Sequence, residues 1–213
     1  MADAQDTIMF QGEIVGQFAV EQSVAVAFDA TARTLTRPSG SFITDGFVAG
    51  QALIAPDAAT NKTKNFLITE VAALVITVDA PPVTAAETTV TLQAFNPVGN
   101  ITSRTGPSST NPRVDVSHSQ SDAREYKPGL QDNGSVSFDG NLVRDDPGLI
   151  ALKTLRNSRG TDTFLIAHGD RLGWERFLAS VETFEPTGSL DGAVTFSAAL
   201  SVSGAITDSE LLS

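Results

Sequence analysis

Apolar and polar residues alternate along several stretches of the chain, which is the pattern of β-strands that bury one face. In SVAVAFDATARTL, Val24, Val26 and Phe28 alternate with small or polar residues. The stretches TTVTLQAFN, TDTFLIAHG and GWERFLASVETFEP also have the β-branched and aromatic residues typical of strands. The chain is therefore predicted to be mostly β.

The longest alternating run, LDGAVTFSAALSVSGAIT, lies near the C-terminus. Strands in globular domains usually run about 3 to 10 residues, so a longer strand suits a barrel or an extended sheet. Two interpretations fit its polar face: a smooth wet wall, or the ordinary solvent face of a sandwich. The apolar face carries Val194, Phe196, Ala198, Leu200 and Val202, and the polar face carries Thr195, Ser197, Ala199, Ser201 and Ser203.

A second short strand is predicted within EYKPGLQDNGSVSFDGNLVRDDPGLI, which runs from Glu125 to Ile150. Asp132, Asn133 and Gly134 tolerate positive φ, so QDNGS is predicted to be a hairpin turn. The strand that follows places Val136, Phe138 and Leu142 on one face and Ser135, Ser137, Asp139 and Asn141 on the other.

The same run also predicts one helix. Asp146 is suited to the N-cap and Pro147 to the first helical position, while Gly160 can end the helix. Leu149, Leu152 and Leu155 form an apolar stripe, and Lys153, Arg156 and Arg159 lie in the last turns, where the helix dipole favours cations.

The rest of the chain suggests how these elements are grouped. Residues 36–85 are predicted to form a small inserted β unit, because short strand-like runs alternate there with polar turns. Residues 1–35 and 86–213 would then form the main β domain. Between Arg104 and Pro128 lies a long polar segment broken by prolines, which is predicted to be functional, disordered or ordered by a neighbouring chain.

Composition and charge exclude several classes of protein. The 213 residues are 41% hydrophobic, with no apolar run long enough for a membrane span, and MADAQDTIMF lacks the features of a signal peptide, so synthesis in the cytoplasm is expected. There is no cysteine, which excludes disulfides and thiolate chemistry. The net charge of −11, with no basic cluster, argues against nucleic-acid binding, although an acidic wall would let nucleic acid pass without adhering.

Candidate catalytic groups are few and isolated. His118 and His168 have no metal-ligand spacing, and no Gly-x-Ser-x-Gly elbow or phosphate-binding glycine loop is present. Asp145 and Asp146 are better explained by the start of the helix than by acid–base chemistry. We therefore predict a protein that is not an enzyme and that uses no metal or cofactor.

From Val98 to Thr207 the order of elements resembles the tail tube (major tail) proteins of long-tailed, non-contractile bacteriophages. The similarity lies in VDVS, SDAREYKPGL, DNGSVSFDGN, DDPG and DGAVTFSAALSVSG, taken in that order. It implies a β-sandwich or barrel with one flanking helix. Copies would form hexameric rings whose inner strands make one barrel, and the rings would stack into the tube that DNA passes through during ejection.

The resemblance also implies roles for particular residues and partners. The polar loop would reach a neighbouring ring, and we single out Arg104, Arg113, Asp115, Asp122, Arg124 and Tyr126 in it. The lumen wall would carry Ser135, Ser137, Asp139, Thr195, Ser197, Ser201 and Ser203. The expected partners are further copies of the chain and other tail proteins (tape measure, tail terminator and distal tail), with no membrane partner, in a virion tail assembled in the host cytoplasm.

Other functions remain open at this stage. One is a β-sandwich binding module, adhesin-like or glycan-recognising, with Phe42 to Val78 as its recognition surface. Another is the tube protein of a secretion system. A hydrolase site assembled from scattered residues is a remote third.

Overall fold

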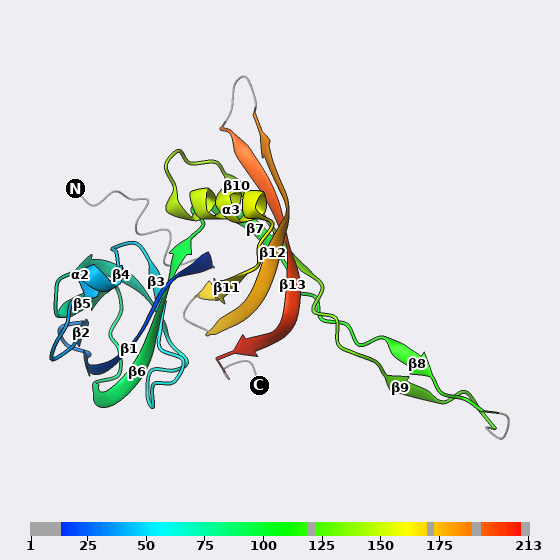
Figure 1. The fold of residues 1–213 in the computed structure, drawn as a ribbon, viewed down its shortest axis with the longest axis horizontal. Helices are drawn as coiled ribbons and strands as arrows, with labels where there is room; N and C mark the ends of the chain where they lie inside the picture. The colour runs from blue at the N-terminus through cyan, green and yellow to red at the C-terminus, as the bar shows by residue number, and fades with distance from the viewer. Residues whose placement is uncertain (1–13, 119–121, 170–172, 189–192, 210–213) are drawn as a thin grey trace.

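The computed structural model describes residues 14–118, 122–169, 173–188 and 193–209. It confirms a mostly β chain: eleven strands form one sheet, two more form a small separate sheet, and one long helix lies against the larger sheet. Figure 1 shows this arrangement. The elements are β1 Ile14–Asp29, β2 Thr34–Thr36, α2 Phe42–Asp45, β3 Ala52–Ile54, β4 Asn65–Val71, β5 Val75–Val78, β6 Ala85–Pro97, β7 Ile101–Thr105, β8 Arg113–Asp115, β9 Tyr126–Pro128, β10 Ser135–Asn141, α3 Pro147–Ser158, β11 Asp162–Ala167, β12 Trp174–Thr187 and β13 Thr195–Asp208.

Six strands close into a barrel at one end of the molecule (Figure 1). Their order is β1-β2-β5-β4-β3-β6, and β6 pairs with β1 to complete the ring. The barrel core contains residues of β1 and β6, such as Phe28 and Leu92, together with Phe42, Phe66 and Ile76. Strand β1 belongs to both parts of the sheet, because it pairs with β2 and β6 in the barrel and with β11 outside it. That 36–85 is an insertion into another domain stays a prediction.

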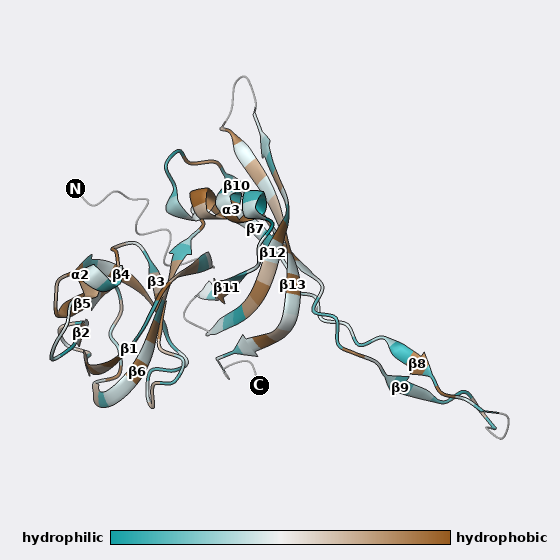
Figure 2. Cartoon of the chain, in the orientation of Figure 1, coloured by the Kyte–Doolittle hydropathy of each residue, from teal (hydrophilic) through white to brown (hydrophobic). Residues whose placement is uncertain are grey.

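The sheet continues from β1 in the order β11-β12-β13-β10-β7, with every neighbouring pair antiparallel. The alternation predicted for the strand at 135–142 is confirmed, since Val136 and Phe138 are 0% and 1% exposed. They pack with Phe196 and Leu200 of β13 in a second core. Bands of different hydropathy alternate along β12 and β13, as expected for strands with one buried face (Figure 2).

The predicted helix is present as α3, and its start is confirmed. Asp146 is the N-cap, its carboxylate accepting from Leu149 N–H at 2.8 Å, and Pro147 is the first helical residue. The predicted end is off by one residue: the C-cap is Arg159, in the left-handed conformation (φ 55°), and not Gly160. The stripe of Leu149, Leu152 and Leu155 is buried against the second core.

Two predictions about local structure are wrong. Segment 42–54 contains a four-residue helix, α2, because Ser41 caps its start and Gly46 (φ 98°) ends it, so only Ala52–Ile54 is a strand there. QDNGS is not a hairpin turn between adjacent strands. Gly134 has the expected positive φ of 62°, but β10 pairs with β7 and β13, which are distant in sequence from the turn.

The polar segment between β7 and β10 extends away from the sheet as an arm (Figure 1). We define the arm as residues 106–134. Strands β8 and β9 pair within it, and Thr110 and Asp132 form a bridge nearer its base. Every residue of β8 and β9 is exposed, so the arm lacks a core of its own. Among the described residues, no helix is long and apolar enough to cross a membrane.

Candidate assembly surfaces

Strands β12, β13, β10 and β7 present one exposed face of small polar side chains. Ser137 lies opposite Ala199 of β13 and Thr105 of β7. In the next row, Asp139 lies opposite Ser197 and Ser103, and the Ser103 hydroxyl donates to the Asp139 carboxylate at 2.9 Å. We call this surface the polar face. It lies opposite the second core because side chains alternate across a sheet.

All seven residues predicted to line a lumen lie on the polar face, on two adjacent strands. Ser135, Ser137 and Asp139 are exposed on β10, and Thr195, Ser197, Ser201 and Ser203 are exposed or half-buried on β13. The sequence missed the contribution of β12, whose Ser180, Thr183, Glu185 and Thr187 extend the same rows. The alternation of polar and apolar residues in TFEPT could have predicted that Thr183, Glu185 and Thr187 lie on one face. The lumen role itself stays a prediction.

The charged side chains on this face are carboxylates. Asp139 and Glu185 lie in one cross-strand row, on either side of Ser197. Arg104 is the single basic residue in β7, β10, Ser180–Thr187 and Thr195–Ser201, all of which the structure describes. It lies opposite buried Phe138, so its side chain leaves from the other face of the sheet. In these segments the polar face therefore has no cationic side chain to which a phosphate backbone could bind.

The four strands end in two edges. β11 covers β12 only along Trp174–Ala179, so Ser180–Thr187 pairs with β13 alone within the described chain. At the opposite side, β7 is the last strand of the sheet and pairs with β10. Exposed strand edges are templates for pairing with another chain.

The arm carries most of the residues that were predicted to reach a neighbour. Arg113 lies over the Tyr126 ring, 5.1 Å from its centroid, and both side chains are exposed. Hydrogen bonds from the Ser117 hydroxyl and backbone N–H hold the pKa of the Asp115 carboxyl below its usual range, so Asp115 is charged at neutral pH. Asp122 and Arg124 are exposed beside the outer end of the arm. Arg104, by contrast, belongs to β7 and not to the arm.

Leu130 is an unusual residue of the arm, because its side chain is 92% exposed. Val114, at 50%, is a second exposed apolar side chain, in β8. Single exposed apolar residues are common on proteins, but here they stand on a two-stranded element without a core. Isolated two-stranded hairpins are marginally stable in water at best.

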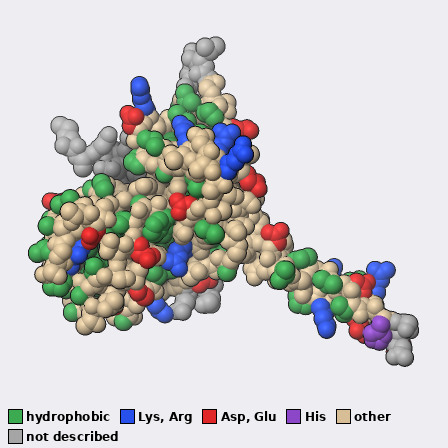
Figure 3. Space-filling view, viewed as in Figure 1, with side chains coloured by type: hydrophobic (Ala, Val, Ile, Leu, Met, Phe, Trp, Pro, Cys, Tyr) green, Lys and Arg blue, Asp and Glu red, His purple; other side chains and the backbone are tan. Residues whose placement is uncertain are grey.

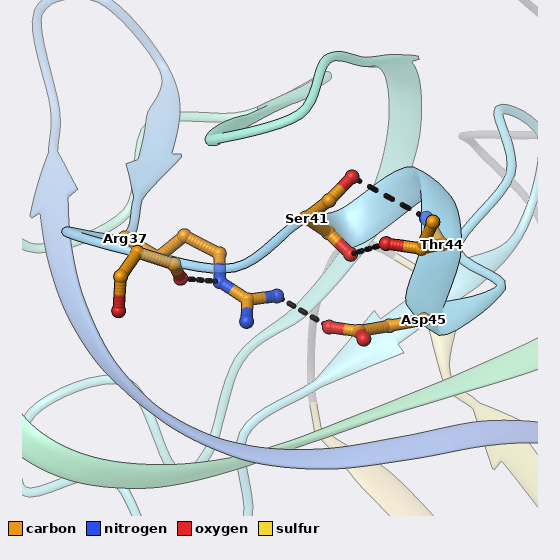
Figure 4. Close-up of polar contacts among 5 residues, drawn as sticks. Arg37, Ser41, Thr44 and Asp45 are labelled. Atoms are coloured by element: carbon orange, nitrogen blue, oxygen red, sulfur yellow. Dashed lines mark hydrogen bonds and ion pairs between the residues drawn. The ribbon is translucent and has the colours of Figure 1, made fainter.

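Residues 42–78, the recognition surface of the alternative binding module, begin at a corner around α2 (Figure 4). The Arg37 guanidinium donates to the Ser39 carbonyl at 2.6 Å and pairs with the Asp45 carboxylate. It also lies over the Phe42 ring, 4.8 Å from the centroid. Ile43, in the same helix, is 57% exposed. The corner is held together by hydrogen bonds and an ion pair among its own residues.

Two open cavities lie between β6 of the barrel and strands β12 and β13, in a groove that we call the crease. The larger, of about 450 Å³, is lined by Asp57, Lys62 and Arg176, among others, and the smaller is about 310 Å³. Arg176 lines both cavities and donates to Gln93 Oε1 at 2.6 Å. Gln93 in turn donates to Glu21, so the polar groups at the centre of the crease bond to one another.

The histidines do not form a catalytic or metal site in the described residues. His168 Nε2 lies 3.5 Å from Glu175 Oε1 at the turn between β11 and β12, and His118 is exposed near the outer end of the arm. Across the described ranges, no group of three or more His, Cys, Asp or Glu side chains is placed to hold a metal ion. Trp174 is 2% exposed and belongs to the core, as predicted.

No protein-family model and no curated protein matches the chain. Among solved structures, it is similar to a chain in the tail of an empty gene transfer agent (GTA) particle, refined with C6 symmetry. That chain is 18% identical, the match covers 53% of this chain and 84% of the other, and the TM-score is 0.45. A chain in the virion of a native GTA particle is 19% identical, with 54% and 88% covered and a TM-score of 0.47.

Proposed function

We propose that the chain is a tail tube protein, which forms hexameric rings that stack into the conduit for DNA ejection from a phage-like virion. The observation that carries the proposal is the four-strand end of the sheet, whose edges are β7 and Ser180–Thr187 of β12. Its polar face has no basic side chain in the described segments β10, Ser180–Thr187 and Thr195–Ser201, and Arg104 of β7 lies on the other face. The ring size of six comes from the family that Val98–Thr207 resembles.

The directions of the strands support a closed ring. β12, β13, β10 and β7 alternate in direction, so the edge strands β12 and β7 run in opposite directions. When copies are related by rotation about one axis, the β12 edge of each copy meets the β7 edge of the next in antiparallel fashion. That is the pairing present in the rest of the sheet. A ring closed in this way has no free edge left to aggregate.

The polar face supports the role of a conduit. In the closed ring it would form one continuous surface of Ser, Thr and Ala with Asp139 and Glu185 between them. DNA adheres to proteins through Lys and Arg, and acidic groups repel its phosphates. Such a surface would let DNA pass without specific binding.

The arm supports stacking between rings. It projects from the end of the sheet at which β7 ends and β10 begins, so in a ring all arms would project toward the same side. A neighbouring ring would cover its exposed Leu130, Val114 and Tyr126 side chains. The tape measure would fill the tube before ejection, and the tail terminator and distal tail proteins would contact its two ends. Assembly would take place in the host cytoplasm.

Negative-stain electron microscopy of the purified chain tests the proposal. We expect rings or tubes without a sheath, and protection of the arm from protease only in the polymer. A chain that stays monomeric at high concentration, alone and with its neighbouring tail proteins, would contradict the proposal.

The same images distinguish a binding module, which would stay monomeric and attach to glycans or host cells through residues 42–78. A secretion-system tube would also form rings, and a tape-measure gene nearby would separate the two.

A further inference from the structure

The exposed side of α3 is basic at the end that lies beside the free half of β12. Lys153 Nζ lies 5.4 Å from the centre of the Phe184 ring, and Lys153, Arg156 and Asn157 line a cavity of about 270 Å³ with Phe184 and Pro186. Figure 3 shows Lys and Arg side chains gathered in this region. In the described part of the chain, neither Lys153 nor Arg156 forms an ion pair.

The opposite end of α3 is acidic and lies beside the other edge of the sheet. Asp146 Oδ2 accepts a hydrogen bond from Gly99 N–H at 3.1 Å, and Gly99 comes just before β7. Asp145 is exposed, with φ 65°, and has no ion-pair partner among the residues that the structure describes. Arg144 is exposed next to it, so this end of α3 carries the two carboxylates of Asp145 and Asp146 and one guanidinium, a net negative charge.

The two ends of α3 therefore carry opposite charges at the two edges that would join in a ring. β10 pairs with both β7 and β13, which places Asn100 and Ile101, Asn141, Thr195 and Thr187 at the same end of the sheet. Asp145 and Asp146 follow Asn141 there, and Phe184 and Pro186, next to the basic residues, lie close to Thr187. The acidic and basic ends of α3 therefore both lie toward this end of the sheet, one near each edge strand.

We propose that Lys153 and Arg156 of one copy face Asp145 of the next copy, so that the α3 helices follow one another head to tail around the ring. This inference rests on the edge-to-edge ring proposed above and adds a contact that selects the correct edges. Opposite charges that meet across an interface speed association and disfavour wrong pairings. The helix dipoles add to the attraction, since the C-terminal end of one α3 approaches the N-terminal end of the next.

Other carboxylates near the basic end do not cancel it. Glu185 follows buried Phe184 in β12, so its side chain lies on the polar face, opposite α3. Glu182 is the exposed residue of a bulge between Val181 and Thr183, and it forms no ion pair with α3 within the described residues. Arg156 and Lys153 remain available to a neighbour.

A charge swap tests the contact. Arg156→Glu and Asp145→Lys are each expected to raise the concentration needed for ring formation about tenfold or more, because each places like charges across the interface. The double variant Asp145→Lys/Arg156→Glu is expected to recover most of the loss, since the pair is restored with its signs exchanged. Assembly is measured by sedimentation and negative-stain microscopy.

Controls separate this inference from the ring proposal. Lys64→Glu, on the β3–β4 connection of the barrel, changes the net charge by the same amount as Arg156→Glu and should leave assembly unchanged. Thermal unfolding of each monomer checks that folding is intact, and raised salt should weaken the wild-type contact. If the wild type forms rings but the single variants assemble as well as it does, or the double variant does not recover, the α3 contact is wrong and the ring stands. If the wild type forms no rings, the proposed function fails.

Discussion

Gly148, the second residue of α3, shows how one position can set the distance between two elements. A Cβ built on it would lie 2.2 Å from the Pro97 carbonyl oxygen and 2.7 Å from Val98 N, both backbone atoms at the end of β6. Only a residue without a side chain lets the helix approach so closely. The same turn of α3 is held by Asp146, which bonds to both Leu149 and Gly99.

Two opposing effects decide what Gly148→Ala does. Alanine favours the helix by about 1 kcal/mol over glycine. The new methyl group would overlap backbone atoms that cannot rotate away, and overpacking of this kind costs typically about 1 to 3 kcal/mol or more. We expect a net loss of stability, seen as a lower midpoint of thermal unfolding. Asn157→Ala, an exposed position of the same helix, is the control and should not destabilise the fold. A Gly148→Ala variant more stable than the wild type would show that the approach is looser than described.

At the scale of elements, the arm and the sheet have separate sources of stability. Strands β7 and β10 pair at the base of the arm, where Ser137 lies opposite Thr105, and the sheet beneath them has its own core. The arm residues beyond the Thr110–Asp132 bridge contribute nothing to that core. Removing them should leave the sheet folded.

Replacing residues 111–131 with Asn-Gly tests this separation. The dipeptide is suited to a two-residue hairpin turn and would join Thr110 to Asp132, which already pair. We expect unchanged unfolding of the monomer, with single rings and no long tubes in electron micrographs, because the sheet edges remain and the stacking element is gone. Long tubes formed without the arm would contradict its role in stacking.

At the scale of the whole molecule, charge is divided among surfaces. The chain has a net charge of −11, and its polar face carries the carboxylates Asp139 and Glu185, while Lys153 and Arg156 of α3 lie on the other side of the sheet. A tube built from such copies would be polar and weakly acidic inside. The proposed function depends on this division more than on any single residue.

Placing lysine on the polar face would reverse its behaviour toward DNA. Ser137→Lys/Ser197→Lys adds two cations per copy at exposed positions of β10 and β13, neither of which is an edge strand. We expect rings and tubes as in the wild type, now with salt-sensitive DNA binding in a filter assay. The matched Ser137→Glu/Ser197→Glu tubes should bind no DNA. Equal binding by both variants would mean that these positions do not line the lumen.

Local patterns in the sequence predicted the features that depend only on neighbouring residues, such as strand alternation and a helix cap. The alternation in SVSFD and in TFSAAL predicted which side chains are buried, because a strand repeats every two residues. Val194, predicted on the same apolar face, precedes β13 and is 42% exposed. Asp146 and Pro147 predicted the start of α3, because a cap needs only its own first turn. Short-range signals failed at α2, where Ser41 and Gly46 bound a helix of four residues, too short to show a period.

Only the tertiary structure decided which strands meet. QDNGS signals a turn, but nothing near it reveals that β10 pairs with β7 across the whole arm and with β13 some sixty residues later. The same holds for the barrel, which closes because β6 returns along β1, and for the edges left on β12 and β7. Strand pairing depends on non-local hydrogen bonds and shared burial, which a period of two cannot encode. The sequence by itself determined the polar side chains of β10 and β13 and the charges of α3, and the fold placed them between β12 and β7, the strands whose edges we propose to join.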